Sequence, residues 1–190
     1  MTEQIETDVA IIGGGPVGLT LAMDLAGRGV RVVVIEERRR GEPPSVKCNH
    51  VAARSMELFR RLGVVENVRN AGLPPDYPHD IAYRTTMTGR EMSRIPIPCR
   101  RDRYTARDGP DTRWPTPEPP HRINQIYLEP ILFAHAWATP GVTIRNRVRF
   151  DDLAQDDTGV TAHAHDLDTG AALSITAHYL VGCDGGKSAV

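Results

Sequence analysis

The chain has 190 residues, of which 40% are hydrophobic, so it is long enough for one globular domain with a core and short for two. Its 23 basic and 24 acidic side chains leave a net charge of −1, which argues against a nucleic-acid-binding or membrane-surface protein. We expect a cytoplasmic protein, because the N-terminus lacks a basic start with an apolar signal core and no apolar run is long enough to cross a bilayer.

A glycine-rich sequence follows the first predicted strand, Val9–Ile12, and fits the pattern G-x-G-x-x-G. In that pattern the first glycine permits a tight turn, the second lets the backbone approach a pyrophosphate, and the third lets the next helix pack close to the strand. The pyrophosphate lies at the helix N-terminus, where unpaired N–H groups and the helix dipole favour an anion. The loop therefore provides five candidate cofactor-binding residues: Gly13, Gly15, Pro16, Val17 and Gly18.

The residues after this loop also fit a nucleotide site. Apolar residues recur at helical spacing, and we expect them to face the core: Val17, Leu21, Ala22, Leu25 and Ala26. A β-branched strand over 30–35 then ends on Glu36. A carboxylate at the end of the second strand, about 20 residues after the glycines, can accept both hydroxyls of an adenosine ribose. The alternative is an ordinary strand, turn and helix without a ligand.

The segment after Glu36 is polar and interrupted by prolines, which predicts a loop. Its arginines, Arg38 to Arg40, can contact the adenine or the phosphates of a nucleotide, or they can simply lie in solvent. Two helices are predicted next, over 51–62 and 64–70. The first has one apolar face, formed by Met56, Phe59 and Leu62.

Residues 73–122 depart from a regular nucleotide-binding fold, and we predict that they form an inserted segment on the substrate side. Strands over 81–87 and 91–97 are expected to form a hairpin around a Thr88-Gly89 turn. Residues 99–122 hold several prolines and arginines, which is typical of a long loop. Its guanidinium groups can receive the phosphates of a reduced nicotinamide cofactor, or the loop is simply solvated.

Regular structure resumes with a helix around Pro130, which must lie in the first turn if the helix is continuous. A short strand begins at Val142, and three strands follow as a meander, over 148–153, 158–166 and 173–182. A symmetric second turn puts six residues on one buried face: Val160, Ala162, Ala164, Ile175, Ala177 and Tyr179.

The opposite face of the meander carries His163, His165 and His178, a residue type that binds metals. No carboxylate or thiolate completes a ligand set on that face, and exposed strand faces are commonly polar, so we expect no metal site. The three cysteines are widely spaced without a C-x-x-C pair, which indicates neither a disulfide framework nor a zinc site.

The last strand runs through the apolar residues 179–181 into the sequence Gly-Cys-Asp-Gly-Gly. This pattern is typical of a central parallel strand that brings a carboxylate, here Asp184, to the edge where open α/β sheets bind ligands.

Four landmarks thus occur in order: GGGPVG with Glu36, the helix ARSMELFRRLG, the segment RINQIYLEP, and GCDGGKS. Over nearly all of the chain, they resemble the flavin-dependent aromatic hydroxylases, single-component monooxygenases of the para-hydroxybenzoate hydroxylase and phenol hydroxylase type. The resemblance implies an α/β fold, with a Rossmann-like FAD-binding domain that has a parallel sheet, a three-stranded β-meander and an inserted β-hairpin.

By this resemblance, the loop 13–18 holds the FAD pyrophosphate and Glu36 holds the adenosine ribose. Gln125 corresponds to a glutamine near the flavin chain. Asp184 corresponds to an Asp-Gly motif that is linked to FAD and to the reduced pyridine nucleotide.

The sequence departs from the family pattern at two points. Many members have an arginine where this chain has Lys47, so either Lys47 or Arg54 is the expected phosphate contact. The family also continues into a second Gly-Asp motif and a domain that binds the aromatic substrate, whereas no Gly-Asp dipeptide occurs here. We therefore expect an N-terminal portion that is incomplete at the C-terminus.

The resemblance implies that NADPH or NADH reduces FAD and that dioxygen then supplies a hydroxyl group for a phenolic or other small aromatic substrate. We predict that the full-length protein is such a monooxygenase and that this portion is inactive alone. The sequence identifies no catalytic residue, and it leaves a homodimer open. Two alternatives are a non-catalytic nucleotide-binding module and an FAD-dependent dehydrogenase or reductase.

Overall fold

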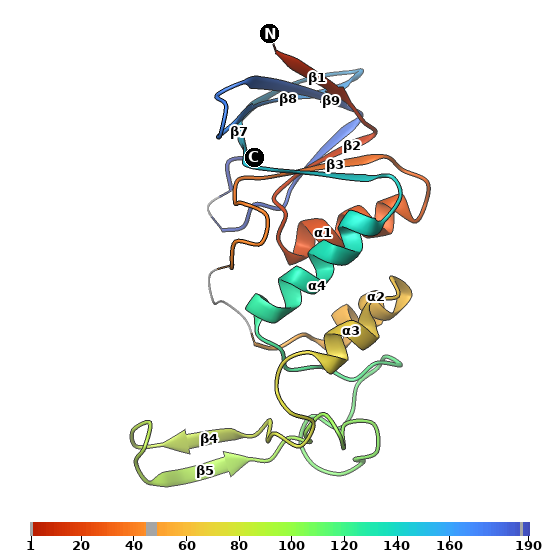
Figure 1. Cartoon of the computed structure of the whole chain (residues 1–190). Coiled ribbons are helices and arrows are strands. Elements are labelled where there is room, and N and C mark those ends of the chain that lie inside the picture. Colours follow the sequence, from red (N-terminus) through yellow and green to blue (C-terminus); the bar gives the residue numbers. More distant parts are fainter. Residues whose placement is uncertain (1, 45–48, 187) are drawn as a thin grey trace. The chain divides into compact units, whose positions relative to one another are not determined.

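A computed structural model describes residues 2–44, 49–186 and 188–190 (Figure 1). The chain forms two compact units, which we call the first unit (1–44 and 129–190) and the second unit (45–128). The first unit is discontinuous in sequence, because the second unit is inserted between its two parts.

The first unit is built on a four-stranded parallel sheet, as predicted. Its strands lie in the order β10 (Tyr179–Gly182), β2 (Val9–Ile12), β3 (Val32–Glu36) and β6 (Val142–Asn146). All of β2 is buried and apolar, which is typical of a strand covered on both faces. The prediction that β10 is central is wrong for the part of the chain that the structure describes. β10 forms an edge of the sheet beside β2, and its residues are partly exposed.

A mixed sheet completes the strands of this unit, in the order β1 (Glu3–Glu6), β9 (Ala172–Ala177), β8 (Gly159–Asp166) and β7 (Val148–Asp156). β7, β8 and β9 are antiparallel neighbours and form the predicted meander. β1 lies parallel to β9 and was not predicted, because its sequence, EQIE, is short and mostly polar.

β9 and β10 are separate strands, whereas the sequence predicted one strand over 173–182. The backbone N–H groups of His178 and Tyr179 both donate to the Asp8 carbonyl oxygen, at 3.1 and 3.3 Å, and the chain passes from one sheet to the other there. Tyr179 is consequently 71% exposed rather than buried. Val160 pairs with Ala177, as a symmetric turn requires. The other five residues predicted for the buried face of the meander are indeed buried.

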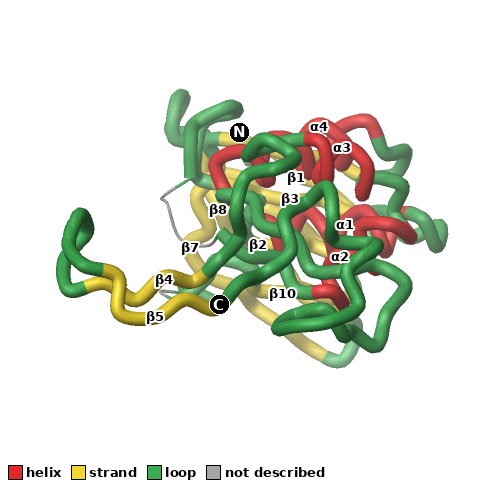
Figure 2. Tube along the Cα trace, turned by 90° about the horizontal axis from the view of Figure 1, so that it is seen from below, coloured by secondary structure: helices red, strands yellow, loops and turns green. Residues whose placement is uncertain are grey.

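Both faces of the parallel sheet are covered. One face packs on the meander through a cluster of buried residues: Ala10, Ile12, Val33, Ile35, Val148, Phe150, Val160, Ala162, Ala164, Leu173, Ile175 and Ala177. On the other side, α1 (Pro16–Ala26) contacts β2, β3 and β6 (Figures 1 and 2). The helix buries Gly18 and Leu19, whereas Val17, predicted to face the core, is 69% exposed. Gly18, rather than Val17, faces β2. The helix approaches β2 so closely there that only a residue without a side chain fits.

The second unit combines short helices with a hairpin. α2 (Ala53–Arg61) and α3 (Val65–Asn70) lie where predicted and contact each other. β4 (Ile81–Arg84) and β5 (Glu91–Ile95) form the predicted antiparallel hairpin, with shorter strands and a longer connection than expected. The hairpin extends from the rest of its unit as a two-stranded ribbon (Figure 2).

α4 (Gln125–Ala138) is continuous although Pro130 lies inside it, beyond the predicted first turn. The Asn124 side chain caps this helix, because its Oδ1 accepts a hydrogen bond from the Ile126 N–H at 3.1 Å. Pro130 is exposed, but it has no N–H to donate to the Ile126 carbonyl oxygen, and its ring crowds that carbonyl group, so the helix is locally weakened there. No helix in the described residues is long and apolar enough to cross a membrane.

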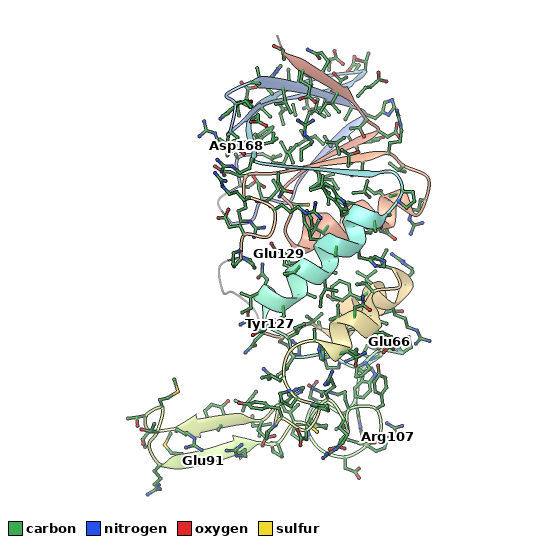
Figure 3. The ribbon with its side chains drawn as sticks, in the orientation of Figure 1. Glu66, Glu91, Arg107, Tyr127, Glu129 and Asp168 are labelled. Carbon is green, nitrogen blue, oxygen red and sulfur yellow. The ribbon has the colours of Figure 1, made fainter. Side chains whose placement is uncertain are left out.

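Residues 99–122 contain no helix or strand, but a purely solvated loop is the wrong description. The Arg103 side chain is only 1% exposed. Glu118 is also buried, and its Oε2 accepts a hydrogen bond from Nη2 of Arg69 on α3, at 3.0 Å. Arg107, in contrast, is exposed (Figure 3). Buried polar contacts therefore order part of this irregular segment.

Two buried histidines lie among these arginines. His79 is 4% exposed and His121 is 2% exposed. Burial, together with the charge of Arg103, lowers the pKa of His79 to about 4. Burial and the charge of Arg69 lower the pKa of His121 to about 4 as well. Both imidazoles are therefore neutral in the folded protein at pH 7.

These two histidines should make the chain less stable as the pH falls from about 6.5 to about 4. The unfolded chain binds protons at the ordinary histidine pKa of about 6.5, whereas the folded chain does so only near 4. We expect the free energy of unfolding, measured with urea, to fall by up to about 1.4 kcal/mol per pH unit for each histidine. The double variant His79→Gln/His121→Gln should show a flatter pH dependence. The exposed His163→Gln is the control, and an equal slope in both variants would contradict the assignment.

Gly18→Ala should lower the free energy of unfolding by about 1–3 kcal/mol, although alanine favours helices. The added Cβ would lie 2.0 Å from the Gly13 carbonyl oxygen and 3.2 Å from Cγ2 of Ile11. Denaturant unfolding measures the loss. Gly186→Ala is the matched control, because no atom lies within 4 Å of its added Cβ. Equal stability of the two variants would show that the contact at Gly18 is not tight.

Candidate functional site

The glycine-rich loop joins β2 to α1 and is shaped by close backbone contacts. Gly13 has a φ of +108°, which favours glycine, and an added Cβ there would lie 2.5 Å from the Cys183 carbonyl oxygen. Gly18 makes the equally close contact with Gly13 described above. The absence of side chains at these two positions brings together the end of β2, the start of α1 and the segment after β10.

Gly15 differs from the other two glycines, because no atom of the described residues outside its chain neighbours lies within 4 Å of the position that its Cβ would take. It is the N-cap of α1, Pro16 starts the helix, and no side chain caps this end. The N–H groups of Val17 and Gly18, in the first turn, therefore have no acceptor within the helix. Open space beside such N–H groups can accommodate an anionic group such as a phosphate.

Glu36 ends β3 beside this loop, and its carboxylate accepts four hydrogen bonds. Oε2 accepts from the Gly14 N–H at 2.8 Å and from Nη2 of Arg38 at 3.1 Å. Oε1 accepts from the Arg38 N–H at 2.9 Å and from its Nε at 3.0 Å. Burial by itself raises the pKa of Glu36, but the bonds and charge of Arg38 outweigh burial and lower the pKa. The carboxylate is therefore ionised at neutral pH.

Arg38 also connects this carboxylate to α4. Its Nη1 lies 2.6 Å from Oε1 of Glu129, whose side chain is 9% exposed and points from α4 toward the segment after β3 (Figure 3). From the sequence, Arg38 was either a nucleotide contact or a solvated residue. Sequence reasoning did not identify Glu129 as its partner. A signal was present, because helical spacing puts Glu129 on the same face as the buried Leu132 and Ala136. A carboxylate on such a face needs a cation or hydrogen-bond donors.

Asp184 follows β10 and lies next to Gly13, since an added Cβ on Gly13 would be 2.9 Å from the Asp184 backbone nitrogen. Its carboxylate accepts hydrogen bonds from the Ser188 hydroxyl and from the Ala189 N–H, both at 2.7 Å. Burial raises the pKa of Asp184, but these hydrogen bonds outweigh it, so the pKa is lowered. Asp184 is thus an ionised carboxylate held by the turn that follows it.

The first unit contains most of the predicted site, at the carboxyl ends of its parallel strands: Gly13, Gly15, Pro16, Val17, Gly18, Glu36 and Asp184. Arg54 and Gln125 belong to the second unit. Arg54 lies on α2 with a 75% exposed side chain and pairs with Glu57 at 3.1 Å, and Gln125 is the first residue of α4. Lys47 lies outside the described residues.

The histidines of the meander differ in their surroundings. His165 does have a carboxylate beside it, contrary to expectation, since its Nδ1 lies 2.7 Å from Oδ2 of Asp151. Among the residues with a described placement, no group of three or more His, Cys, Asp or Glu side chains can hold a metal ion. His163 is exposed on β8, and His178 is exposed between β9 and β10.

Known proteins with similar sequences and structures are flavoproteins. The chain is 31% identical to phenol 2-monooxygenase from Pseudomonas sp. (strain EST1001). This match covers 100% of the present chain and 30% of that enzyme. The rebeccamycin biosynthetic enzyme RebC, solved with reduced flavin, is 41% identical with a TM-score of 0.84, over 98% of this chain and 34% of RebC. The flavin-dependent monooxygenase PieE, solved with FAD and substrate, is 28% identical with a TM-score of 0.82, over 97% of this chain and 31% of PieE.

The chain therefore spans about a third of the length of these proteins. The resemblance inferred from the four sequence landmarks is confirmed, as are the Rossmann-like fold, the meander and the hairpin. The model of a family described as "FAD binding domain" matches residues 6–190, and the chain belongs to this family.

Proposed function

We propose that the whole protein is an FAD-dependent monooxygenase that hydroxylates a phenolic or other aromatic substrate with dioxygen and NADPH or NADH. The observation that carries this proposal is the open space at Gly15, beside the first N–H groups of α1, which have no acceptor within the helix, in a chain of the FAD-binding family. Its support also includes the similarity to a phenol monooxygenase and to a monooxygenase bound to FAD and substrate.

In this proposal the loop 13–18 binds the FAD pyrophosphate through its backbone N–H groups. Glu36 receives the adenosine ribose, and Asp184 lies at the strand ends toward the flavin and the reduced pyridine nucleotide. Arg54 or Lys47 supplies a phosphate contact, and Gln125 lies near the flavin chain. These roles are supported by the charges of the residues, and by the position of the loop, Glu36 and Asp184 at the strand ends of the first unit.

FAD, when bound, supplies the redox chemistry and the reaction with dioxygen. The residues of this chain bind and orient it. The loop keeps side chains away from the diphosphate, because Gly15 leaves space there, and the N-terminus of α1 offers partial positive charge. The ionised Glu36 has no proton to give and acts only as an acceptor. We propose in addition that residues 73–122 contribute to the substrate side. A cytoplasmic location stays a prediction, and a homodimer stays open.

Gly15→Asp should reduce FAD binding at least about tenfold, because a carboxylate in the open space repels the diphosphate and a loss of ~1.4 kcal/mol already gives that factor. The measurement is visible flavin absorbance of the full-length protein after mixing with FAD and desalting. Gly27→Asp, the same substitution at the exposed C-cap of α1, is the control and should retain FAD. Equal retention by both variants would remove the loop from the cofactor site.

The full-length protein with FAD should consume dioxygen and NADPH or NADH when a phenolic substrate is present, and should release a hydroxylated product. An oxygen electrode and mass spectrometry of the product measure this directly. Substrate turnover without dioxygen would support the dehydrogenase alternative instead. Flavin binding without turnover of any phenolic substrate would support the non-catalytic module.

A further inference from the structure

The carboxylate that we propose for ribose binding has no free acceptor position in this structure. Nε and Nη2 of Arg38 bind one Glu36 oxygen each, and the N–H groups of Gly14 and Arg38 bind the same two oxygens. A carboxylate offers about four acceptor positions. Two ribose hydroxyls can therefore bind Glu36 well only if two of these donors leave.

The four donors are not equally able to leave. The Gly14 N–H belongs to the glycine-rich loop, whose backbone is fixed by its contacts with α1 and Cys183. The Arg38 backbone is held as well, because its carbonyl oxygen accepts a hydrogen bond from Nδ2 of Asn146 on β6, at 3.1 Å. The Arg38 guanidinium, in contrast, is at the end of a flexible side chain that is 28% exposed.

The guanidinium also has a second carboxylate that can keep its charge paired. Nη1 of Arg38 lies 2.6 Å from Oε1 of Glu129, and this contact does not involve the two nitrogen atoms that bind Glu36. A rotation that releases Glu36 can therefore preserve the ion pair with Glu129. Losing both partners would be far more costly, because Arg38 is partly desolvated.

We propose that Arg38 is a positioning residue of the nucleotide site, whose guanidinium releases Glu36 when the two hydroxyls of an adenosine ribose bind there and stays paired with Glu129. The inference rests on the proposed function. Without a nucleotide, Arg38 satisfies a carboxylate that is only 12% exposed. With a nucleotide, each bond from a ribose hydroxyl replaces a charge-assisted bond from the guanidinium, so the hydroxyls add little net affinity.

The test measures how much the ribose hydroxyls contribute to binding. Calorimetric titration of the FAD-free full-length protein gives dissociation constants for ADP and for 2′,3′-dideoxy-ADP, and their ratio reports the hydroxyl contribution. The wild-type ratio should be small. In Arg38→Met both guanidinium positions on Glu36 become free, and the ratio should rise about tenfold, which corresponds to about 1.4 kcal/mol. In the double variant Glu36→Gln/Arg38→Met the ratio should fall well below that of Arg38→Met, because the uncharged amide offers only one acceptor oxygen.

The neighbouring Arg39→Met is the matched control. The Arg39 side chain is 69% exposed and lies 3.6 Å from Asp168, not from Glu36, so the ratio should not change. Arg38→Lys provides a second variant that keeps the positive charge. A lysine ammonium is a point charge that cannot bind both carboxylate oxygens as the guanidinium fork does, so an intermediate rise is expected even if Arg38→Met fails to fold.

The outcomes separate this inference from the proposed function. If ADP binds, Gly15→Asp weakens it, and both Arg38 variants keep the wild-type ratio, then Arg38 does not compete with the ribose and the inference is overturned. If ADP does not bind the wild type, or Gly15→Asp leaves its affinity unchanged, the nucleotide site itself is misplaced and both fail. A rise in the ratio that persists in Glu36→Gln/Arg38→Met also overturns the inference, because Arg38 then acts through another group.

Discussion

The structure of the first unit depends on a backbone contact between the start of α1 and the end of β2. At Gly18 the helix approaches the Gly13 carbonyl group so closely that a side chain would overlap it, and Gly13 in turn lies against the Cys183 peptide. The end of β2 and the start of α1 meet the segment after β10, which is far away in sequence, because neither glycine has a Cβ. Gly15, the N-cap of α1, has open space beside it, and the N-terminus of α1 therefore borders this space. The shape of the candidate site is thus a consequence of how the helix packs on the sheet.

Charge in this unit is balanced by a short chain of ionic contacts. Arg38 follows β3 and lies between two carboxylates, those of Glu36 at the end of β3 and Glu129 on α4, whose side chains are 12% and 9% exposed. The arrangement carries a net negative charge, which suits sugar hydroxyls better than phosphates. The N-terminus of α1 has the opposite character, since its N–H groups favour an anion. In the proposed function, the ribose and the diphosphate of a bound nucleotide would thus meet complementary groups on adjacent elements.

The second unit is organised differently, with polar contacts inside an irregular segment. Arg69 on α3 and Glu118 in the proline-rich segment form a buried pair, and Arg103 donates to the carbonyl and carboxylate oxygens of Asp111, at 2.9 Å each. Because side-chain pairs between residues 8 and 49 positions apart hold it, no local periodicity marks the segment as ordered. Its composition alone therefore suggested a solvated loop, which is wrong for these residues.

The sequence by itself determined the order of the elements, the parallel sheet, the meander, the hairpin and the family. Each of these depends on local patterns: apolar runs, alternation, and glycines at fixed spacing. The tertiary structure decided what depends on partners distant in sequence. It split the last predicted strand at Asp8, added the polar β1 as a partner of β9, placed β10 at an edge, and paired Arg38 with Glu129. Spacing can show that a carboxylate ends a strand, but only the packed chain shows which donors already occupy its oxygens.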